Sequence, residues 1–197
     1  MKTTVKTLLT GFALGLFFCS HAQLPNTASA QDFKKVIRDY PNQFRHLQGE
    51  LLQEKNQSTD YDLNFPFGSV EKAVITRYSS KGKPVVACEA LVVTTENFAD
   101  AARKYHSIYA TFNNMAVKMD NGVTFYLKGT YEAPVEEVRF NSSMLVFEKP
   151  EPYVSKMKVE VSMQYEFMEW TVRVKIYDRD REDAEQGDQI DEEELDD

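Results

Sequence analysis

Oxygen-bearing side chains in one segment of the chain have the spacing closest to a ligand-binding motif. Asp60, Asp62 and Asn64 alternate along it, and Glu71 follows at the twelfth position. This is the spacing with which an EF-hand loop places its oxygens around calcium. The sixth position of such a loop is glycine, because the chain turns sharply there, whereas here it is Phe65 followed by a proline. We therefore predict a polar loop that leads into a strand and binds no metal, with a calcium-dependent module as the alternative.

Two histidines are the candidates for acid–base or metal chemistry. His46 and His106 are the histidines beyond residue 22, and imidazole is the side chain whose charge changes near neutral pH. A joint site requires the segment around His46 to fold against the helix that carries His106. His106 follows the apolar Tyr105 and so points away from the apolar face of that helix. We predict that both side chains face solvent, and a hydrolase-like enzyme that uses them is the alternative.

Other enzyme signatures are missing from the sequence. The chain contains no Gly-x-Ser-x-Gly, His-Glu-x-x-His, phosphate-loop or dinucleotide-binding pattern. Its eight glycines are not clustered, which argues against a phosphate cradle. We therefore predict no catalytic residues, no cofactor and a function in binding.

Two tyrosines are the candidates for a contact surface on a sheet. Tyr126 and Tyr177 fall on the outward-facing phase of strands whose residues alternate in polarity. Exposed aromatic side chains can mark a contact surface for a protein or a carbohydrate. The other interpretation is that they are ordinary sheet residues, because aromatic side chains favour strands. We name them, with the two histidines, as binding candidates.

Residues 1–22 have the layout of a secretory signal peptide. Two lysines precede an apolar stretch from Leu8 to Phe18, and Ser20-His21-Ala22 provides a small-x-small cleavage site. The apolar stretch is too short for a permanent membrane span. We predict export to the periplasm or the exterior of a bacterial cell, with a mature chain that begins at Gln23. Lipidation of Cys19 is the alternative, which the phenylalanine before that cysteine disfavours.

The charge of the chain is concentrated at its C-terminal end. The net charge is −8, and residues 182–197 contain ten acidic and no basic side chains. Residues 23–181 contain 21 acidic and 21 basic side chains, and such a neutral body does not favour nucleic acid as a partner. The tail has too few apolar residues to offset the entropy of ordering, so we predict that it is disordered.

The mature chain is predicted to begin with a mobile leader, residues 23–30, and a helical segment. The helix starts at Asp32, whose carboxylate can accept hydrogen bonds from the free amides of the first turn. Pro41 disfavours helix at the residue before it, so the apolar residues up to Leu52 are expected in a kinked continuation or a second short helix. A loop is predicted over residues 55–68. The apolar face of the first helix consists of Phe33, Val36, Ile37 and Tyr40.

A hairpin and a long helix follow. The hairpin pairs residues 70–78 with the apolar run 84–93 through a turn at Gly82. Cys88 lies in this run, and as the single cysteine beyond residue 22 it is predicted to be a buried small hydrophobe without a disulfide. The helix is predicted over residues 95–116, with its first residue as N-cap. The apolar stripe that should face the sheet consists of Phe98, Ala101, Ala102, Tyr105, Ile108, Tyr109, Phe112 and Met115.

Two hairpins complete the predicted sheet. The first turns around Pro134, and the last turns at Glu166-Phe167. Each register is chosen so that inward-facing apolar residues meet one another, because a slip of one residue turns a strand's whole apolar set to the wrong face. The predicted pairs of the first hairpin are Tyr131–Val138, Phe125–Met144 and Val123–Val146. Those of the second are Tyr165–Met168, Met163–Trp170, Val161–Val172, Val159–Val174 and Met157–Ile176.

Together these elements predict one α+β domain over residues 31–181. We expect a two-layer sandwich in which a curved antiparallel sheet of about six strands packs on one long helix, preceded by the N-terminal helical segment. The order of elements resembles that of roadblock and profilin-like domains, and fold alone implies no function. We predict an exported, non-enzymatic domain that binds a protein or another cell-envelope component through its sheet face or tail. Neither nucleic acid binding nor membrane insertion after removal of the signal is expected.

Overall fold

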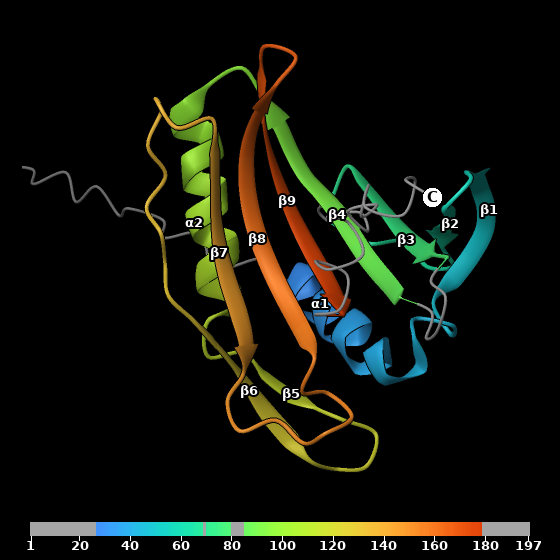
Figure 1. Ribbon diagram of the computed structural model, residues 1–197. Coiled ribbons are helices and arrows are strands. Elements are labelled where there is room, and N and C mark those ends of the chain that lie inside the picture. Colours follow the sequence, from blue (N-terminus) through green and yellow to red (C-terminus); the bar gives the residue numbers. More distant parts are fainter. Residues whose placement is uncertain (1–26, 69, 80–84, 179–197) are drawn as a thin grey trace, which may run out of the picture.

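One antiparallel sheet and two α-helices form the described part of this computed structural model, residues 27–68, 70–79 and 85–178 (Figure 1). The sheet has nine strands in the order β1-β2-β3-β4-β9-β8-β7-β6-β5, so that β4 and β9 pair in its middle. The helical elements are α1 (Thr27–Asp39), a 3-10 turn (Tyr40–Asn42) and α2 (Phe98–Phe112). The strands are β1 (Gln48–Glu54), β2 (Ser58–Leu63), β3 (Lys72–Tyr78), β4 (Val85–Thr95), β5 (Ala116–Lys118), β6 (Thr124–Gly129), β7 (Phe140–Phe147), β8 (Met157–Glu166) and β9 (Glu169–Asp178).

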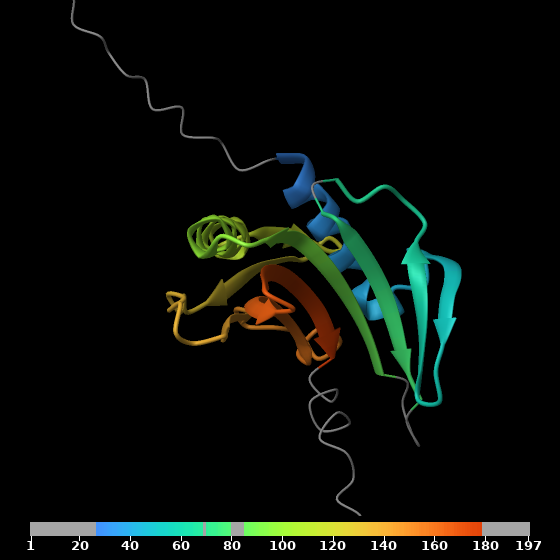
Figure 2. The ribbon, with the colours of Figure 1, turned by 90° about the horizontal axis from the view of Figure 1, so that it is seen from above.

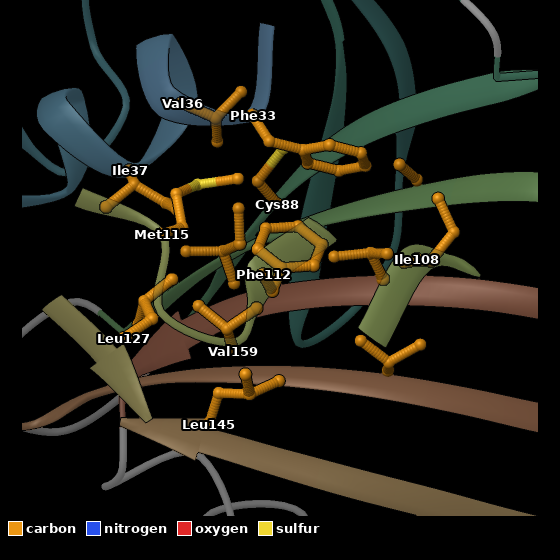
Figure 3. Close-up of a cluster of buried hydrophobic side chains, with 14 of the residues drawn as sticks. Phe33, Val36, Ile37, Cys88, Ile108, Phe112, Met115, Leu127, Leu145 and Val159 are labelled. Atoms are coloured by element: carbon orange, nitrogen blue, oxygen red, sulfur yellow. The ribbon is translucent and has the colours of Figure 1, made fainter. Parts of the chain in front are cut away.

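Both helices lie on the same face of the sheet (Figure 2). α2 packs on β4, β8 and β9, and α1 contacts β5. Phe33 of α1, Cys88 of β4, Phe112 of α2 and Leu145 of β7 belong to one buried cluster (Figure 3). The α+β class and the antiparallel sheet are therefore confirmed. The strand count is corrected, because nine strands stand in place of about six. The predicted N-terminal helical segment corresponds to α1.

α1 begins at Thr27, before the predicted N-cap Asp32. Asp32 lies inside the helix, and its Oδ2 accepts a hydrogen bond from the Gly68 amide at 2.9 Å. This bond ties α1 to the connection between β2 and β3. Residues 27–30, which the sequence assigns to a mobile leader, belong to the helix. The predicted apolar face is confirmed, since Phe33, Val36, Ile37 and Tyr40 are all buried.

β1 and β2 occupy the segment for which the sequence predicts a second helix and a loop. Gln43 and Phe44 adopt left-handed backbone conformations, with φ of 57° and 55°, and this turns the chain away from the helix axis. Phe44 and Leu47 are buried, whereas Leu51 and Leu52 are exposed on the edge strand β1. The helical prediction is wrong because these apolar residues divide between core and solvent.

α2 is shorter than predicted and has a different N-cap. The Asn97 side chain accepts a hydrogen bond from the Asp100 amide at 3.1 Å, whereas Thr95, the predicted cap, is the last residue of β4. The helix ends at Phe112, and Ala116 already belongs to β5. The predicted stripe does face the sheet, since Ala101, Tyr105, Ile108, Tyr109 and Phe112 are buried.

The predicted register of the β6–β7 hairpin is wrong by an odd number of residues. The face of β7 that is predicted to be exposed therefore packs on the core. Leu127 pairs with Phe147, and the side chain of Ser143 is fully buried. A serine is tolerated there because its hydroxyl hydrogen-bonds with the Tyr105 hydroxyl at 2.6 Å and accepts from the Glu132 amide at 3.0 Å. Strand β7 buries Ser143, Leu145 and Phe147, and it leaves Phe140 and Val146 exposed.

The β8–β9 hairpin is shifted by two residues from the predicted register. Its turn consists of Phe167 and Met168, one residue later than predicted. Trp170 pairs with Tyr165 instead of Met163. Because the shift is even, the other predicted apolar residues of both strands still face the core, as their burial shows. Met168, the predicted partner of Tyr165, instead lies in the turn and is exposed.

Three predicted features lie outside the described residues. They are the signal peptide over residues 1–22, the turn at Gly82 and the acidic tail over residues 182–197. Among the described residues, neither helix has the length and apolar character needed to cross a membrane.

Candidate functional site

A hollow of about 840 Å³ lies beside the edge strand β1, between β1, β2, β3 and the connection from β2 to β3. We call it the β1–β3 hollow. Concave sites with apolar walls and a few polar groups are typical of ligand binding, and this one has that character. The apolar side chains that line it are Leu52, Leu63, Phe65, Pro66, Phe67, Val70 and Ala73, and the charged ones are Glu50, Asp62, Glu71 and Lys72.

Two phenylalanines form an aromatic wall of the hollow. The rings of Phe65 and Phe67 are stacked, with centroids 5.8 Å apart. Phe67 also makes an edge contact with the core residue Phe33 of α1 at 4.7 Å, and the Lys35 ammonium lies 3.7 Å from the centroid of Phe65. Both rings pack against the core and remain partly accessible. α1 therefore anchors the wall through Phe33 and Lys35.

Asp60, the first candidate calcium ligand, does not line this hollow. Its carboxylate accepts hydrogen bonds from the Lys55 ammonium at 2.8 Å and the Thr76 hydroxyl at 2.7 Å. Partial burial works to raise the pKa of Asp60, but these two hydrogen bonds and the nearby charge of Lys72 outweigh it and hold the pKa below its usual value. Asp60 therefore already has cationic neighbours.

The other candidate calcium ligands line the hollow, and each has a separate partner. Asp62 accepts from the backbone amide of the next residue at 2.8 Å. Asn64 donates to the His46 carbonyl at 2.7 Å. Glu71 accepts from the Thr94 amide at 2.9 Å and from the Thr94 hydroxyl at 2.8 Å. In the described part of the chain, no three His, Cys, Asp or Glu side chains are grouped so that they could hold a metal.

His46 forms a pair with the buried carboxylate of Asp39. Its Nδ1 lies 2.7 Å from Asp39 Oδ1, and its backbone amide donates to Oδ2 at 3.1 Å. Asn42 donates to the same carboxylate at 2.9 Å, so Asp39 holds the turn after α1 together. A carboxylate can orient imidazole as a general base, but acyl transfer also needs a nucleophile. The hollow of about 370 Å³ beside this pair has no serine, threonine or cysteine in its lining, which is Pro41, Asn42, Gln43, Arg45 and His46.

His106 is exposed on α2, as predicted. Its ring makes an edge contact with Tyr131, with centroids 5.1 Å apart. Tyr131 also contacts the rings of Tyr105 and Tyr109. The two histidines therefore have different neighbours, Tyr131 for His106 and Asp39 for His46.

The two candidate tyrosines have different environments. Tyr126 is 49% exposed on β6, as predicted. Tyr177 is only 4% exposed, and its hydroxyl donates to Glu160 at 3.4 Å. It lies on a central strand, between Ala87 of β4 and Lys158 of β8. The expectation of an exposed Tyr177 is wrong, because strand phase alone does not decide burial in the middle of a wide sheet.

Two potential nucleophiles are sealed in the core. Burial raises the pKa of Cys88 to about 12, and the neighbouring charge of Glu89 adds to this shift. The prediction that Cys88 is a buried hydrophobe is confirmed. Burial also raises the pKa of Tyr105 to about 12, despite the opposing hydrogen bond with Ser143. Both groups therefore stay protonated at neutral pH.

Sequence reasoning does not find the β1–β3 hollow. It assigns Leu52 to a helix and residues 55–68 to a loop, so nothing in it brings these residues together. The signal that points to the wall is the Phe-Pro-Phe run after alternating acidic residues. Comparison with protein-family models, curated proteins and solved structures finds no match.

Proposed function

We propose that this protein is an exported, non-enzymatic binding domain that takes up an extended apolar segment of a protein or another envelope component in the β1–β3 hollow. The observation that carries the proposal is the stacked pair Phe65 and Phe67, which lines the hollow and stays partly accessible. Burying such aromatic surface against a ligand is favourable, because apolar area leaves water.

The edge strand beside the hollow supports binding of an extended segment. Within the described sheet β1 pairs with β2 on one side only. Its seven residues contain no proline, which favours pairing with an added strand, although its pairing with β2 is irregular on both sides of Leu51. In this mode main-chain hydrogen bonds supply affinity, and pockets for alternate side chains supply specificity. The hollow provides such a pocket next to β1.

The charges of the rim indicate which segment fits best. Glu50, Asp62 and Glu71 contribute three carboxylates to the lining, and Lys72 contributes one ammonium. Complementary charge favours the right partner and speeds its encounter. We therefore propose that basic residues flank the apolar residues of the bound segment.

A binding role also agrees with the chemistry of the described side chains. The pair of His46 and Asp39 has no hydroxyl or thiol in the adjoining hollow. Cys88 is buried, and its thiol has a pKa too high for attack at neutral pH. These observations support binding over catalysis.

The binding proposal can be tested with a display library of random peptides panned on the mature protein. We expect enrichment of peptides that combine aromatic or aliphatic residues with lysine or arginine. Leu52→Glu should weaken an enriched peptide by about tenfold or more, which corresponds to ~1.4 kcal/mol. Leu51→Glu is the matched control, because Leu51 is its exposed neighbour on β1 and does not line the hollow. Enrichment of acidic peptides, or equal effects of the two substitutions, would contradict the proposal.

The export proposal has its own test. The protein purified from its native host should begin at Gln23 and should fractionate outside the cytoplasm, because residues 1–22 have the layout of a signal peptide. Mass spectrometry checks the N-terminus. An acylated Cys19, or an uncleaved chain in the cytoplasm, would contradict this part.

A further inference from the structure

The turn between β8 and β9 carries the two most exposed large apolar side chains of the described residues. Phe167 is 96% exposed and Met168 is 79% exposed. The turn forms the end of the molecule drawn at the top of Figure 1, beyond the paired residues of β4. Single exposed apolar residues are common on protein surfaces, but two adjacent ones at a projecting tip point to a contact.

The backbone of this turn is strained. Phe167 and Met168 have φ of 50° and 70°. A two-residue turn with positive φ at both positions strongly favours asparagine and glycine. Other residues are strained in this conformation, and such strain is concentrated at functional sites. Both the exposure and the backbone strain of Phe167 and Met168 lower the stability of the fold. Stability therefore does not explain why these two residues occupy the turn.

An aromatic base holds the turn in place. Tyr165 and Trp170, which are cross-strand partners below it, have ring centroids 5.0 Å apart. Phe98 of α2 packs edge-on against Trp170 at 5.2 Å. The turn thus stands on a packed support that joins the hairpin to α2. This support fixes the backbone of the turn, which therefore loses less entropy on binding.

Two further exposed apolar residues lie at and just before the start of β7, which pairs with β8 below the turn. Phe140 pairs with Gln164 of β8, and the Tyr165 amide donates to the Arg139 carbonyl at 2.8 Å. Val138 and Phe140 are each half-exposed. The turn is therefore flanked by further accessible apolar area.

Exposed acidic side chains neighbour these apolar residues along the chain, and Cζ of Arg139 lies 5.6 Å from the ring centroid of Tyr165. Glu136, Glu137 and Glu169 are exposed, while Arg139 is the exposed basic residue among them. This charge disfavours anionic lipid head groups and favours a basic protein surface. We infer that Phe167 and Met168 form a docking tip for a protein partner that presents an apolar pocket rimmed by lysine or arginine. The tip shares no residue with the β1–β3 hollow, so the inference does not depend on the proposed function.

Photo-cross-linking in the native host tests the inference. Phe167 is replaced by p-benzoylphenylalanine in the full chain, and Tyr126, an exposed aromatic residue on β6, is replaced in the same way as a control. We expect one protein to be cross-linked from position 167 and not from position 126. The cross-linked peptide of that protein should map to an apolar depression that has basic side chains at its edge.

A turn variant then separates docking from folding. The double substitution Phe167→Asn, Met168→Gly keeps the turn conformation and removes both apolar side chains. The purified partner should bind this variant about tenfold or more weakly than the native chain, a change of ~1.4 kcal/mol. Vesicles of phosphatidylglycerol and phosphatidylethanolamine serve as the lipid probe, and they should bind neither form.

Each other outcome overturns the inference. Adducts with lipid, vesicle binding that is lost in the turn variant, or adducts with a second copy of this chain would assign the tip to another occupant. Identical adducts from positions 167 and 126, no adduct from position 167, or equal affinity of the two forms for the partner would show that the tip does not dock. None of these results bears on peptide binding at the β1–β3 hollow, which is measured separately.

Discussion

Trp170→Ala should be strongly destabilising, because the indole lies where β9 meets both β8 and α2. Trp170 is 4% exposed. Its ring lies 5.2 Å from that of Phe98 and 5.0 Å from that of Tyr165. Truncation of a buried tryptophan to alanine costs about 3–5 kcal/mol. Both aromatic contacts are lost at once, so we expect the upper half of that range, a large share of the ~5–15 kcal/mol typical of a whole domain.

The measurement is urea unfolding followed by far-ultraviolet circular dichroism, since the substitution removes the only tryptophan and with it the fluorescence signal. Phe167→Ala is the control, because it removes an aromatic ring from the same hairpin at a position that is 96% exposed. The control should change the free energy of unfolding by about 0.5 kcal/mol or less. A loss below ~1 kcal/mol for Trp170→Ala would refute the packing described for this end of the sheet.

The remaining predictions concern the turn, the thiol, calcium and the tail. Phe167→Asn with Met168→Gly should raise the free energy of unfolding by about 1 kcal/mol or more in urea titrations, because it relieves two strained residues. The Cys88 thiol has a pKa of about 12 in the folded chain and an ordinary value of 9.0, so it ionises at lower pH in the unfolded chain. The free energy of unfolding should therefore fall from about pH 9 upward, and it should fall less in Cys88→Ala. Calcium should leave the Tm unchanged, and micromolar binding that disappears in Asp60→Ala would contradict this. Deleting residues 182–197 should also leave the Tm nearly unchanged, and a large drop would show that the tail packs on the domain.

Elements with regular alternation could be predicted from the sequence. The stripe on α2 and the inward faces of β8 and β9 follow from periodicity alone, because each strand of that hairpin is polar on one face. The actual turn could not be predicted, because it leaves Phe167 and Met168 in water. Reasoning that maximises apolar pairing instead brings Met168 into the ladder. The predicted register of the β8–β9 hairpin therefore differs from the actual one by two residues, and an even shift leaves each strand with the same face toward the core.

The orientation of β7 could not be read from its sequence. Residues 144–147 are apolar on both faces of the strand, so alternation does not choose between them. The choice depends on Ser143, whose hydroxyl finds a partner in Tyr105 of a distant helix. No pattern in the sequence around β7 indicates a contact with a side chain so far away in the chain.

The candidate site could not be predicted either, because it also depends on residues that are brought together only by the fold. Its lining combines Leu52 of an unpredicted edge strand with Phe65 and Phe67 of a connection. β1 itself depends on the left-handed conformation of Gln43 and Phe44, which no residue type there signals. Residues whose side-chain type suggests a function, such as histidine and tyrosine, are easier to name from the sequence. The structure nevertheless gives His46 and His106 separate neighbours and buries Tyr177.

The pairing of β4 with β9 has a consequence for how the chain reaches its native state. The strands β1 to β4 follow one another along the chain, as do β5 to β9, so each set can pair through short connections. Joining the sets brings Ala87 beside Tyr177, and the entropy of closing so long a loop slows this step. We expect two locally formed half-sheets that merge late, with α2 packing across both β4 and β9 as they join. Refolding should therefore be limited by the meeting of these halves, and a cut between them, in the loop before β5, should yield fragments that reassociate.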